Sequence, residues 1–115
     1  MAKAKFDRVS FFSDVHDICR LIPKGRVTSY GAIGAYLGSK KSARMVGWAM
    51  HAAVSEHGVP AHRVVNSKGL LTGKHHFKGT SMADRLEAEG VKVKDDKVQD
   101  FKTVFWDPVT ELTFD

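Results

Sequence analysis

The 115-residue sequence has one cysteine, three prolines and no long apolar run. The lone thiol, Cys19, has no second cysteine with which to form a disulfide or a CxxC pair, so a reducing, cytoplasmic setting fits. No stretch approaches the roughly 18 apolar residues of a membrane span. No apolar run follows the basic start at residues 1–5, and we expect no secretory signal. The length predicts a single domain, 1–115, with one hydrophobic core.

Acidic residues are scarce in the middle of the chain. Residues 20–83 carry ten Lys and Arg against one acid, Glu56. Residues 1–19 are neutral, and residues 84–115 carry five bases and nine acids. A concentrated basic segment is typical of nucleic-acid binding. A generally basic, solvated surface would give the same composition, so charge alone leaves both interpretations open.

Helical periodicity dominates the first half of the chain. A first amphipathic helix is predicted before Pro23, and its apolar side comprises Phe11, Phe12, Val15, Ile18, Cys19 and Ile22. After an extended link at 26–28, Thr28 or Ser29 is expected to cap a second helix that ends at Gly38. The inward residues of this second helix are predicted to be Ile33, Tyr36 and Leu37.

A third helix is expected after a cap at Ser39 or Ser42. Its predicted inward side comprises Ala43, Val46, Gly47 and Met50, with Trp48 placed in the core in preference to a groove contact. A short helix, a glycine turn and a helix that opens with basic residues indicate a helix-turn-helix. The fold class predicted is mainly α with a small β element, a winged-helix-like helix-turn-helix domain.

The second half is expected to be less regular. Residues 63–65 and 70–71 predict a small hairpin or turn, and Ser81 is expected to cap a last helix that ends at Gly90. Val91 and Val93 suggest a short strand. The tail 94–115 is expected to pack back on the domain, since its aromatic residues would be costly to leave exposed: Phe101, Phe105 and Trp106.

The segment Pro60-Ala61-His62-Arg63-Val64-Val65 resembles the active site of the O6-alkylguanine-DNA alkyltransferases, whose motif is Pro-Cys-His-Arg-Val. The stretches 22–30, 43–50 and 84–90 are similar to the family's DNA-binding link, recognition helix and glutamate helix. The resemblance covers about 12–93, without the family's separate N-terminal domain. Ala61 in place of the cysteine indicates an alkyltransferase-like protein, although members of that group usually carry tryptophan there.

The resemblance implies roles for the residues around Ala61. His62 and Glu89 match the histidine and glutamate that activate the cysteine, with the glutamate acting through water, and here we interpret them as a retained structural pair. Alanine offers no nucleophile, so we expect no enzymatic activity. Cys19 lies on the apolar side of the first helix, and we interpret it as a buried structural thiol away from the pocket.

The resemblance also implies DNA contacts. Arg44 matches an arginine finger that fills the gap left by a flipped nucleotide, against the alternative of a surface phosphate contact. Tyr30 matches a tyrosine that helps rotate the base, against the alternative of a half-buried tyrosine at a helix start. Lys40, Lys41 and Ser42 are expected to contact phosphates, with a solvated face as the alternative for the two lysines.

The pocket for the lesion is expected between 59–64, the loop 72–80 and the start of the helix at 31–37. Its predicted residues are Tyr30, Val59, Pro60, Ala61, Arg63, Val64 and Lys74. Lys74 is the nearest match to a base that stacks on the flipped guanine in alkyltransferase-like proteins, and its assignment is left open. His75 and His76 have no third ligand and are interpreted as loop residues, so no metal or cofactor is expected.

The function implied is recognition of O6-alkylguanine in double-stranded DNA, by minor-groove binding and nucleotide flipping, without alkyl transfer. Such a protein would act as a monomer away from membranes, in the cytoplasm or on the bacterial nucleoid, and would pass the lesion to nucleotide excision repair proteins. Two alternatives stay open. One is a helix-turn-helix regulator that reads undamaged sequence, and the other is a repair enzyme with an unrecognised nucleophile.

Overall fold

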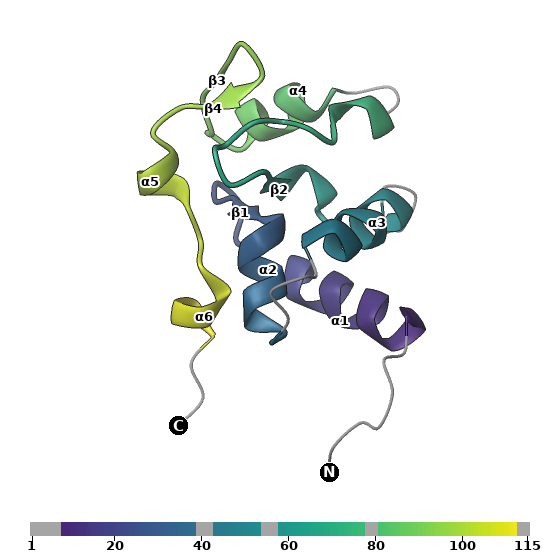
Figure 1. The fold of residues 1–115 in the computed structure, drawn as a ribbon. Helices are drawn as coiled ribbons and strands as arrows, with labels where there is room; N and C mark the ends of the chain where they lie inside the picture. Colours follow the sequence, from purple (N-terminus) through teal and green to yellow (C-terminus); the bar gives the residue numbers. More distant parts are fainter. Residues whose placement is uncertain (1–7, 39–42, 54–57, 78–80, 113–115) are drawn as a thin grey trace.

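A computed structural model describes residues 8–38, 43–53, 58–77 and 81–112 of the chain. Its first half is helical, and the described part of its second half is a series of short elements (Figure 1). The helices of the first half are α1 (Arg8–Arg20), α2 (Tyr30–Tyr36) and α3 (Ala43–Ala53). The expected contacts Lys40, Lys41 and Ser42 lie outside the described residues, as does the cap at Ser39 or Ser42.

The remaining elements are short. Two 3-10 turns and three helices are η1 (Ala61–Arg63), η2 (Lys74–His76), α4 (Met82–Ala88), α5 (Phe101–Val104) and α6 (Pro108–Glu111). The strands are β1 (Thr28–Ser29), β2 (Val64–Val65), β3 (Val93–Lys94) and β4 (Lys97–Val98). The fold is thus mainly α with a small β element, as predicted.

Local sequence explains where two of the helices begin and end. Ser29 caps α2 by accepting a hydrogen bond from the backbone N–H of Ala32, and Ser81 caps α4 by accepting one from Asp84. Just beyond these helices, Gly38 and Gly90 have φ values of +83° and +90°. Residues with a side chain rarely adopt such angles, so glycine allows the chain to leave the helix there.

Of the small hairpin or turn predicted for 63–65 and 70–71, the turn is found and the hairpin is not. β2 instead pairs in parallel with β1, with Thr28 opposite Val64. Residues 66–70 form a turn closed by a hydrogen bond from the backbone N–H of Asn66 to the carbonyl of Leu70. The hydrogen-bonding groups of β2 are therefore used by a strand far away in the sequence, which local patterns do not reveal. The predicted strand at 91–93 starts at Val93, which pairs with Val98 of β4.

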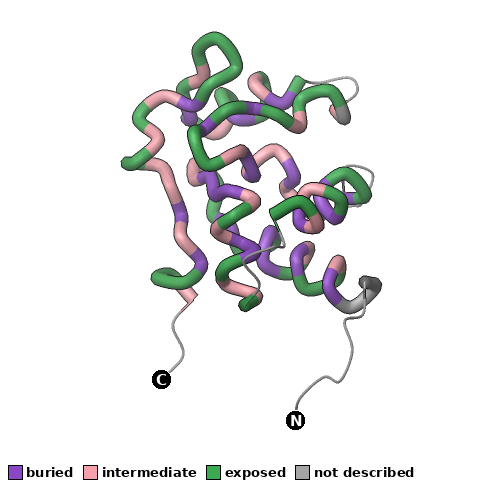
Figure 2. Tube along the Cα trace, viewed as in Figure 1, coloured by how far each residue is buried: buried purple, intermediate pink, exposed green. Residues whose placement is uncertain are grey.

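Two hydrophobic clusters form the core, and the buried residues line the centre of the molecule in Figure 2. The first joins the apolar side of α1 to α2, α3 and η1, and the second lies between β2, α4 and β4. Phe77 packs against both clusters. Trp106 is buried in the first, and its backbone N–H donates to the carbonyl of Val27, so the segment after β4 runs beside β1.

The burial of residues along α3 differs in part from the predicted inward side. Val46 and Met50 are buried as expected, whereas Ala43 is exposed and Gly47 is half-buried. Trp48, expected in the core, has 49% of its surface exposed. It lies two residues from Val46 and Met50, which places it away from the buried side of a helix with 3.6 residues per turn. On the buried side of α3, His16 of α1 donates a hydrogen bond from Nε2 to the carbonyl of Ala49, at 2.8 Å, and this bond joins the two helices.

Candidate functional site

A pocket of about 220 Å³ opens between α2, α3 and η1. It is lined by Tyr30 and Ala61, by the loop residues Thr72, Gly73 and Phe77, by Met82 of α4, and by one side of α3 comprising Ala43, Gly47, Met50 and His51. Tyr30 and Ala61 are 31 positions apart in the sequence, and the parallel pairing of β1 with β2 brings their segments together. The pocket therefore joins the two motifs on which the resemblance depends.

Tyr30 is positioned at the first residue of α2, directly after the cap at Ser29. Burial raises the pKa of its hydroxyl above the usual value, although a hydrogen bond with the Thr72 side chain opposes this shift. Gly73 leaves the space for that hydroxyl, because a Cβ at Gly73 would lie 3.0 Å from it. The phenol thus stays protonated at neutral pH and places a hydroxyl group at the wall of the pocket.

Only part of the predicted pocket faces this space. Val64 is 1% exposed in the core, and Val59, Pro60 and Arg63 line a separate recess of about 290 Å³. The 3-10 turn η1 explains the division, because residues three apart lie above one another in such a turn. Pro60 and Arg63 consequently share one side, while Ala61 faces the other, toward α3 and Tyr30.

Lys74 also lies apart from the pocket. Its ammonium group forms an ion pair with Asp96, in the turn between β3 and β4. The two side chains are 40% and 50% exposed. The neighbouring residue His75 is exposed as well. Within residues 8–38, 43–53, 58–77 and 81–112, no three His, Cys, Asp or Glu side chains gather in a way that would hold a metal ion.

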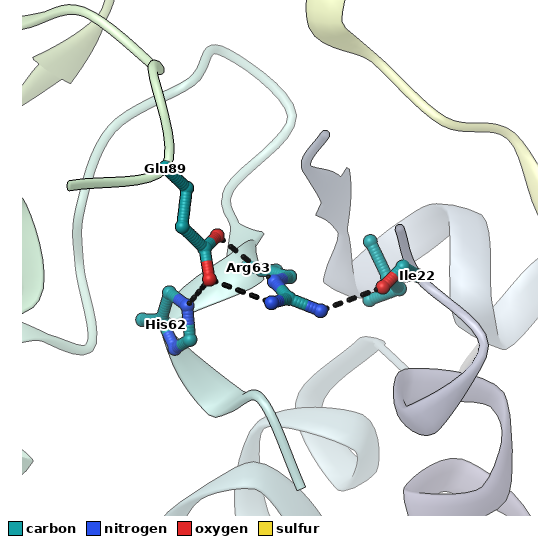
Figure 3. Close-up of polar contacts among 4 residues, drawn as sticks. All are labelled: Ile22, His62, Arg63 and Glu89. Carbon is teal, nitrogen blue, oxygen red and sulfur yellow. Dashed lines mark hydrogen bonds and ion pairs between the residues drawn. The ribbon is translucent and has the colours of Figure 1, made fainter. Parts of the chain in front are cut away.

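His62, Glu89 and Arg63 form a partly buried polar cluster next to Ala61 (Figure 3). His62 Nε2 donates to Glu89 Oε2 at 3.0 Å, and Arg63 donates to both carboxylate oxygens at 3.0 and 2.6 Å. Arg63 Nη1 also donates to the carbonyl of Ile22, at 2.8 Å, beyond the end of α1. The His62–Glu89 contact is direct, where the resemblance implies one through water. The cluster ties η1 to α1 and α4.

The charges of this cluster are set by its hydrogen bonds and its burial. Burial alone would raise the pKa of Glu89, but the hydrogen bonds from Arg63 and His62 outweigh it and lower that pKa to about 2. Burial lowers the pKa of His62, against the opposing effect of Glu89. Near neutral pH Glu89 is therefore ionised and His62 is neutral, with its proton on Nε2.

Cys19 is fully buried, and its thiol lies 3.3 Å from the sulfur of Met50, which lines the pocket. It is closer to the pocket than the sequence suggests, but Met50 separates the two. Burial raises the pKa of the thiol to about 12, although Arg20 opposes this shift. A thiol is nucleophilic as the thiolate, so Cys19 is inert at neutral pH.

Eight residues that line the pocket are absent from its predicted set: Ala43, Gly47, Met50, His51, Thr72, Gly73, Phe77 and Met82. Thr72 and Gly73 lie in the expected loop, but nothing in their sequence marks them as facing Tyr30. Met82 is the first residue of α4, where its apolar side chain predicts burial only. His51 is exposed on α3, and spacing from Gly47 is the signal that places it on the same side.

The fold and the pocket define a small helix-turn-helix domain with a pocket beside its second helix. Residues 10–91 match the family described as "6-O-methylguanine DNA methyltransferase, DNA binding domain". The chain belongs to this family. No helix in the described part of the chain is long and apolar enough to cross a membrane.

Two curated relatives cover most of the chain. "Alkyltransferase-like protein 1" of Schizosaccharomyces pombe is 39% identical over 93 residues, which are 80% of this chain and 86% of the relative. A "DNA base-flipping protein" of Escherichia coli is 35% identical over 99 residues, or 84% of this chain and 74% of the relative. Both are similar to this chain over a length that includes the helix-turn-helix.

Solved structures agree with this assignment. S. pombe Atl1 in complex with damaged DNA containing O6-carboxymethylguanine matches with a TM-score of 0.78 and 33% identity, over 90% of this chain and all of the other. Mycobacterium tuberculosis OGT in complex with DNA matches with a TM-score of 0.57 and 34% identity, over 69% of this chain and 48% of the other. The fold is therefore that of alkyltransferase-like proteins and of the alkyltransferase DNA-binding domain.

Proposed function

We propose that this chain binds DNA at O6-alkylguanine, holds the flipped nucleotide in the pocket beside Ala61, and leaves the alkyl group in place. The pocket carries the proposal, because it joins Tyr30 and Ala61 in a space of about 220 Å³ that Met50, Phe77 and Met82 also line. The nearby cluster of His62, Arg63 and Glu89 keeps η1 in position without a nucleophile to activate. The names of two relatives, an "Alkyltransferase-like protein 1" and a "DNA base-flipping protein", support a function in DNA binding of this kind.

The DNA surface in this proposal is α3 and the start of α2. Arg44 is exposed on the first turn of α3, beside the pocket residue Ala43. A guanidinium there is placed to fill the gap that a flipped nucleotide leaves in the base stack. One chain supplies the pocket and this helix, so a monomer suffices. A lesion that is held and not repaired has to be passed on, and we propose nucleotide excision repair as the recipient.

A binding titration tests the central claim. Two duplexes of the same sequence, one with O6-methylguanine and one with guanine, are titrated at one salt concentration, and the recovered DNA is then analysed for methyl loss. We expect tighter binding to the modified duplex and complete recovery of O6-methylguanine. Methyl groups on the protein would instead support a repair enzyme, and strong sequence preference without lesion preference would support a regulator.

Arg44→Ala tests the contact within the DNA surface, with Arg20→Ala as its matched control. Arg20 is an exposed arginine on α1 that pairs with Asp17. We expect Arg44→Ala to reduce the preference for the modified duplex, because an unfilled gap makes flipping more costly. Arg20→Ala should retain that preference. Equal preference in the Arg44→Ala and wild-type proteins would contradict the assignment of a finger.

A further inference from the structure

Trp48 is a large apolar side chain on the outer surface of α3. Its exposed fraction is 49%, whereas the second tryptophan, Trp106, is 3% exposed in the core. A single exposed apolar residue is common and carries no meaning by itself. The position of Trp48 on α3 is what points to a ligand.

α3 divides into three sides. Its buried side packs on α1 and α2 through Val46, Ala49, Met50 and Ala53. A second side faces the pocket through Ala43, Gly47, Met50 and His51. Arg44 and Trp48 are exposed and four residues apart, so they share the third side, separated by about 6 Å along the helix axis. A ligand that extends along this side of the helix from Arg44 therefore also meets Trp48.

The chemistry of this side favours a polyanion. Helix Ala43–Ala53 contains no Asp or Glu, and the chain around it is strongly basic. DNA combines anionic phosphates with deoxyribose rings, whose C–H groups offer an apolar surface to an aromatic ring. An acidic protein partner could also pair with Arg44, but it would leave the neighbouring pocket on α3 without a ligand.

We propose that Trp48 packs against a deoxyribose in the wall of the bound groove, about two base steps from the nucleotide that faces Arg44. This inference rests on the proposed function, which places Arg44 at the flipped nucleotide. The separation follows from the 6 Å along α3 and the roughly 3.4 Å per base step of a DNA strand. Trp48 is thus an anchor for duplex DNA, separate from the residues that select the lesion.

The proposal has consequences that a phosphate or base contact would not have. Deoxyribose is the same at every nucleotide, so removal of the ring weakens binding to damaged and undamaged duplexes by one common factor. The contact neutralises no phosphate, so the slope of log affinity against log salt stays unchanged. The ring also becomes covered, so Trp48 fluorescence loses its accessibility to acrylamide when DNA binds.

The test uses the full chain with the matched O6-methylguanine and guanine duplexes. Trp48→Ala should weaken binding to both by about tenfold, the size found when stacked aromatic side chains are removed. Trp48→Phe, which retains a ring, should lose less than about threefold. The salt slope and the ratio of the two affinities should match the wild type. Emission from Trp106 reports that each variant remains folded, because that side chain is buried.

Each outcome decides between the alternatives. Equal affinities of the Trp48→Ala and wild-type proteins, with Trp48 still quenched by acrylamide in the wild-type complex, would overturn the proposal and assign this surface to another partner. A loss confined to the modified duplex would overturn it in favour of a lesion contact. If the wild type binds both duplexes equally, the proposed function fails. The Trp48 contact is then still tested by comparing the affinities of Trp48→Ala and wild-type proteins for the unmodified duplex. Failure of the wild type to bind either duplex overturns both.

Discussion

His62 and Glu89 are joined by a direct hydrogen bond of 3.0 Å, although the alanine between Pro60 and His62 leaves them no thiol to serve. Glu89 also receives two hydrogen bonds from Arg63, and all three side chains are 11–14% exposed. His62 and Glu89, which by resemblance match the pair that activates a cysteine, are thus joined with Arg63 in one hydrogen-bonded cluster between η1 and the end of α4.

This cluster predicts a loss of stability in acid. The pKa of Glu89 falls from 4.5 to about 2 on folding, so its contribution is complete above pH 4.5 and is lost as the pH falls toward 2. The full difference corresponds to about 3 kcal/mol. The lowered pKa of His62 acts in the same direction below pH 6.5, because the unfolded chain binds that proton more readily.

Glu89→Gln should lower the free energy of unfolding at pH 7 by about 2–3 kcal/mol, since the partly buried Arg63 loses its charged partner. It should also remove the part of the acid loss that occurs between pH 4.5 and 2. Urea unfolding at several pH values measures both effects. Glu87→Gln is the matched control, because Glu87 is an exposed residue of the same helix. If both variants have the same urea midpoint as the wild type, the cluster is not structural.

The sequence predicts more of the helices than of the site. Ser29 and Ser81 act as caps because a side-chain oxygen next to a helix start is a local signal; Ser81 is found as predicted, and Ser29 is the one of the two candidates, Thr28 and Ser29, that caps α2. Trp48 shows the limit of such signals. Periodicity locates the buried side of α3, but it does not separate the side that lines a pocket from the side that faces solvent.

The site depends on non-local pairing. The motif around Ala61 identifies the segment, but the parallel register of β2 against β1 and the turn of η1 decide which of its residues face Tyr30. The sequence leaves the role of Lys74 open, and it gives no sign of the partner Asp96, which lies in a turn beyond the family match. Local patterns carry no information about such contacts.

Tyr30 and Gly73 predict a coupled pair of substitutions. Gly73 has an ordinary backbone conformation with φ −89°, so alanine is strained there only by its 3.0 Å approach to the Tyr30 hydroxyl. Gly73→Ala should lower the free energy of unfolding by about 1 kcal/mol. In a Tyr30→Phe background it should be neutral or stabilising by about 0.5 kcal/mol, because the unfolded chain becomes less flexible. Urea unfolding of the four proteins gives the coupling energy.

Gly31→Ala is the control for this cycle. A Cβ at Gly31 meets no atom within 4 Å, and the residue lies in α2, so alanine should stabilise the protein in both backgrounds. Equal effects of Gly73→Ala with and without the Tyr30 hydroxyl would show that the two groups do not touch.

Cys19 is expected to be unreactive in the folded protein. With a pKa of about 12, only about one molecule in ten thousand carries the thiolate at pH 8, and the sulfur is buried. In native buffer, iodoacetamide should therefore modify Cys19 only when the protein unfolds. In urea, where the chain is unfolded, the modification should be rapid. Leu21→Cys adds a thiol at a position that is 53% exposed, and it should react at once. Alkylation of Cys19 by O6-methylguanine DNA would contradict the proposal of binding without transfer.

Ala61 predicts tolerance of bulky adducts. Its small side chain lines the pocket together with Tyr30 and Met50, and a larger residue there would occupy space that is open to an alkyl group. Affinities for duplexes with O6-methylguanine and O6-benzylguanine should differ little in the wild type. In Ala61→Trp the benzyl duplex should bind at least about tenfold more weakly than the methyl duplex, because overpacking typically costs 1–3 kcal/mol. Ala61→Val should give an intermediate ratio, and it separates the effect of volume from that of an aromatic ring. If the ratio of the two affinities is the same in all three proteins, Ala61 does not set the size of the adduct, and the alkyl group must point toward another part of the pocket.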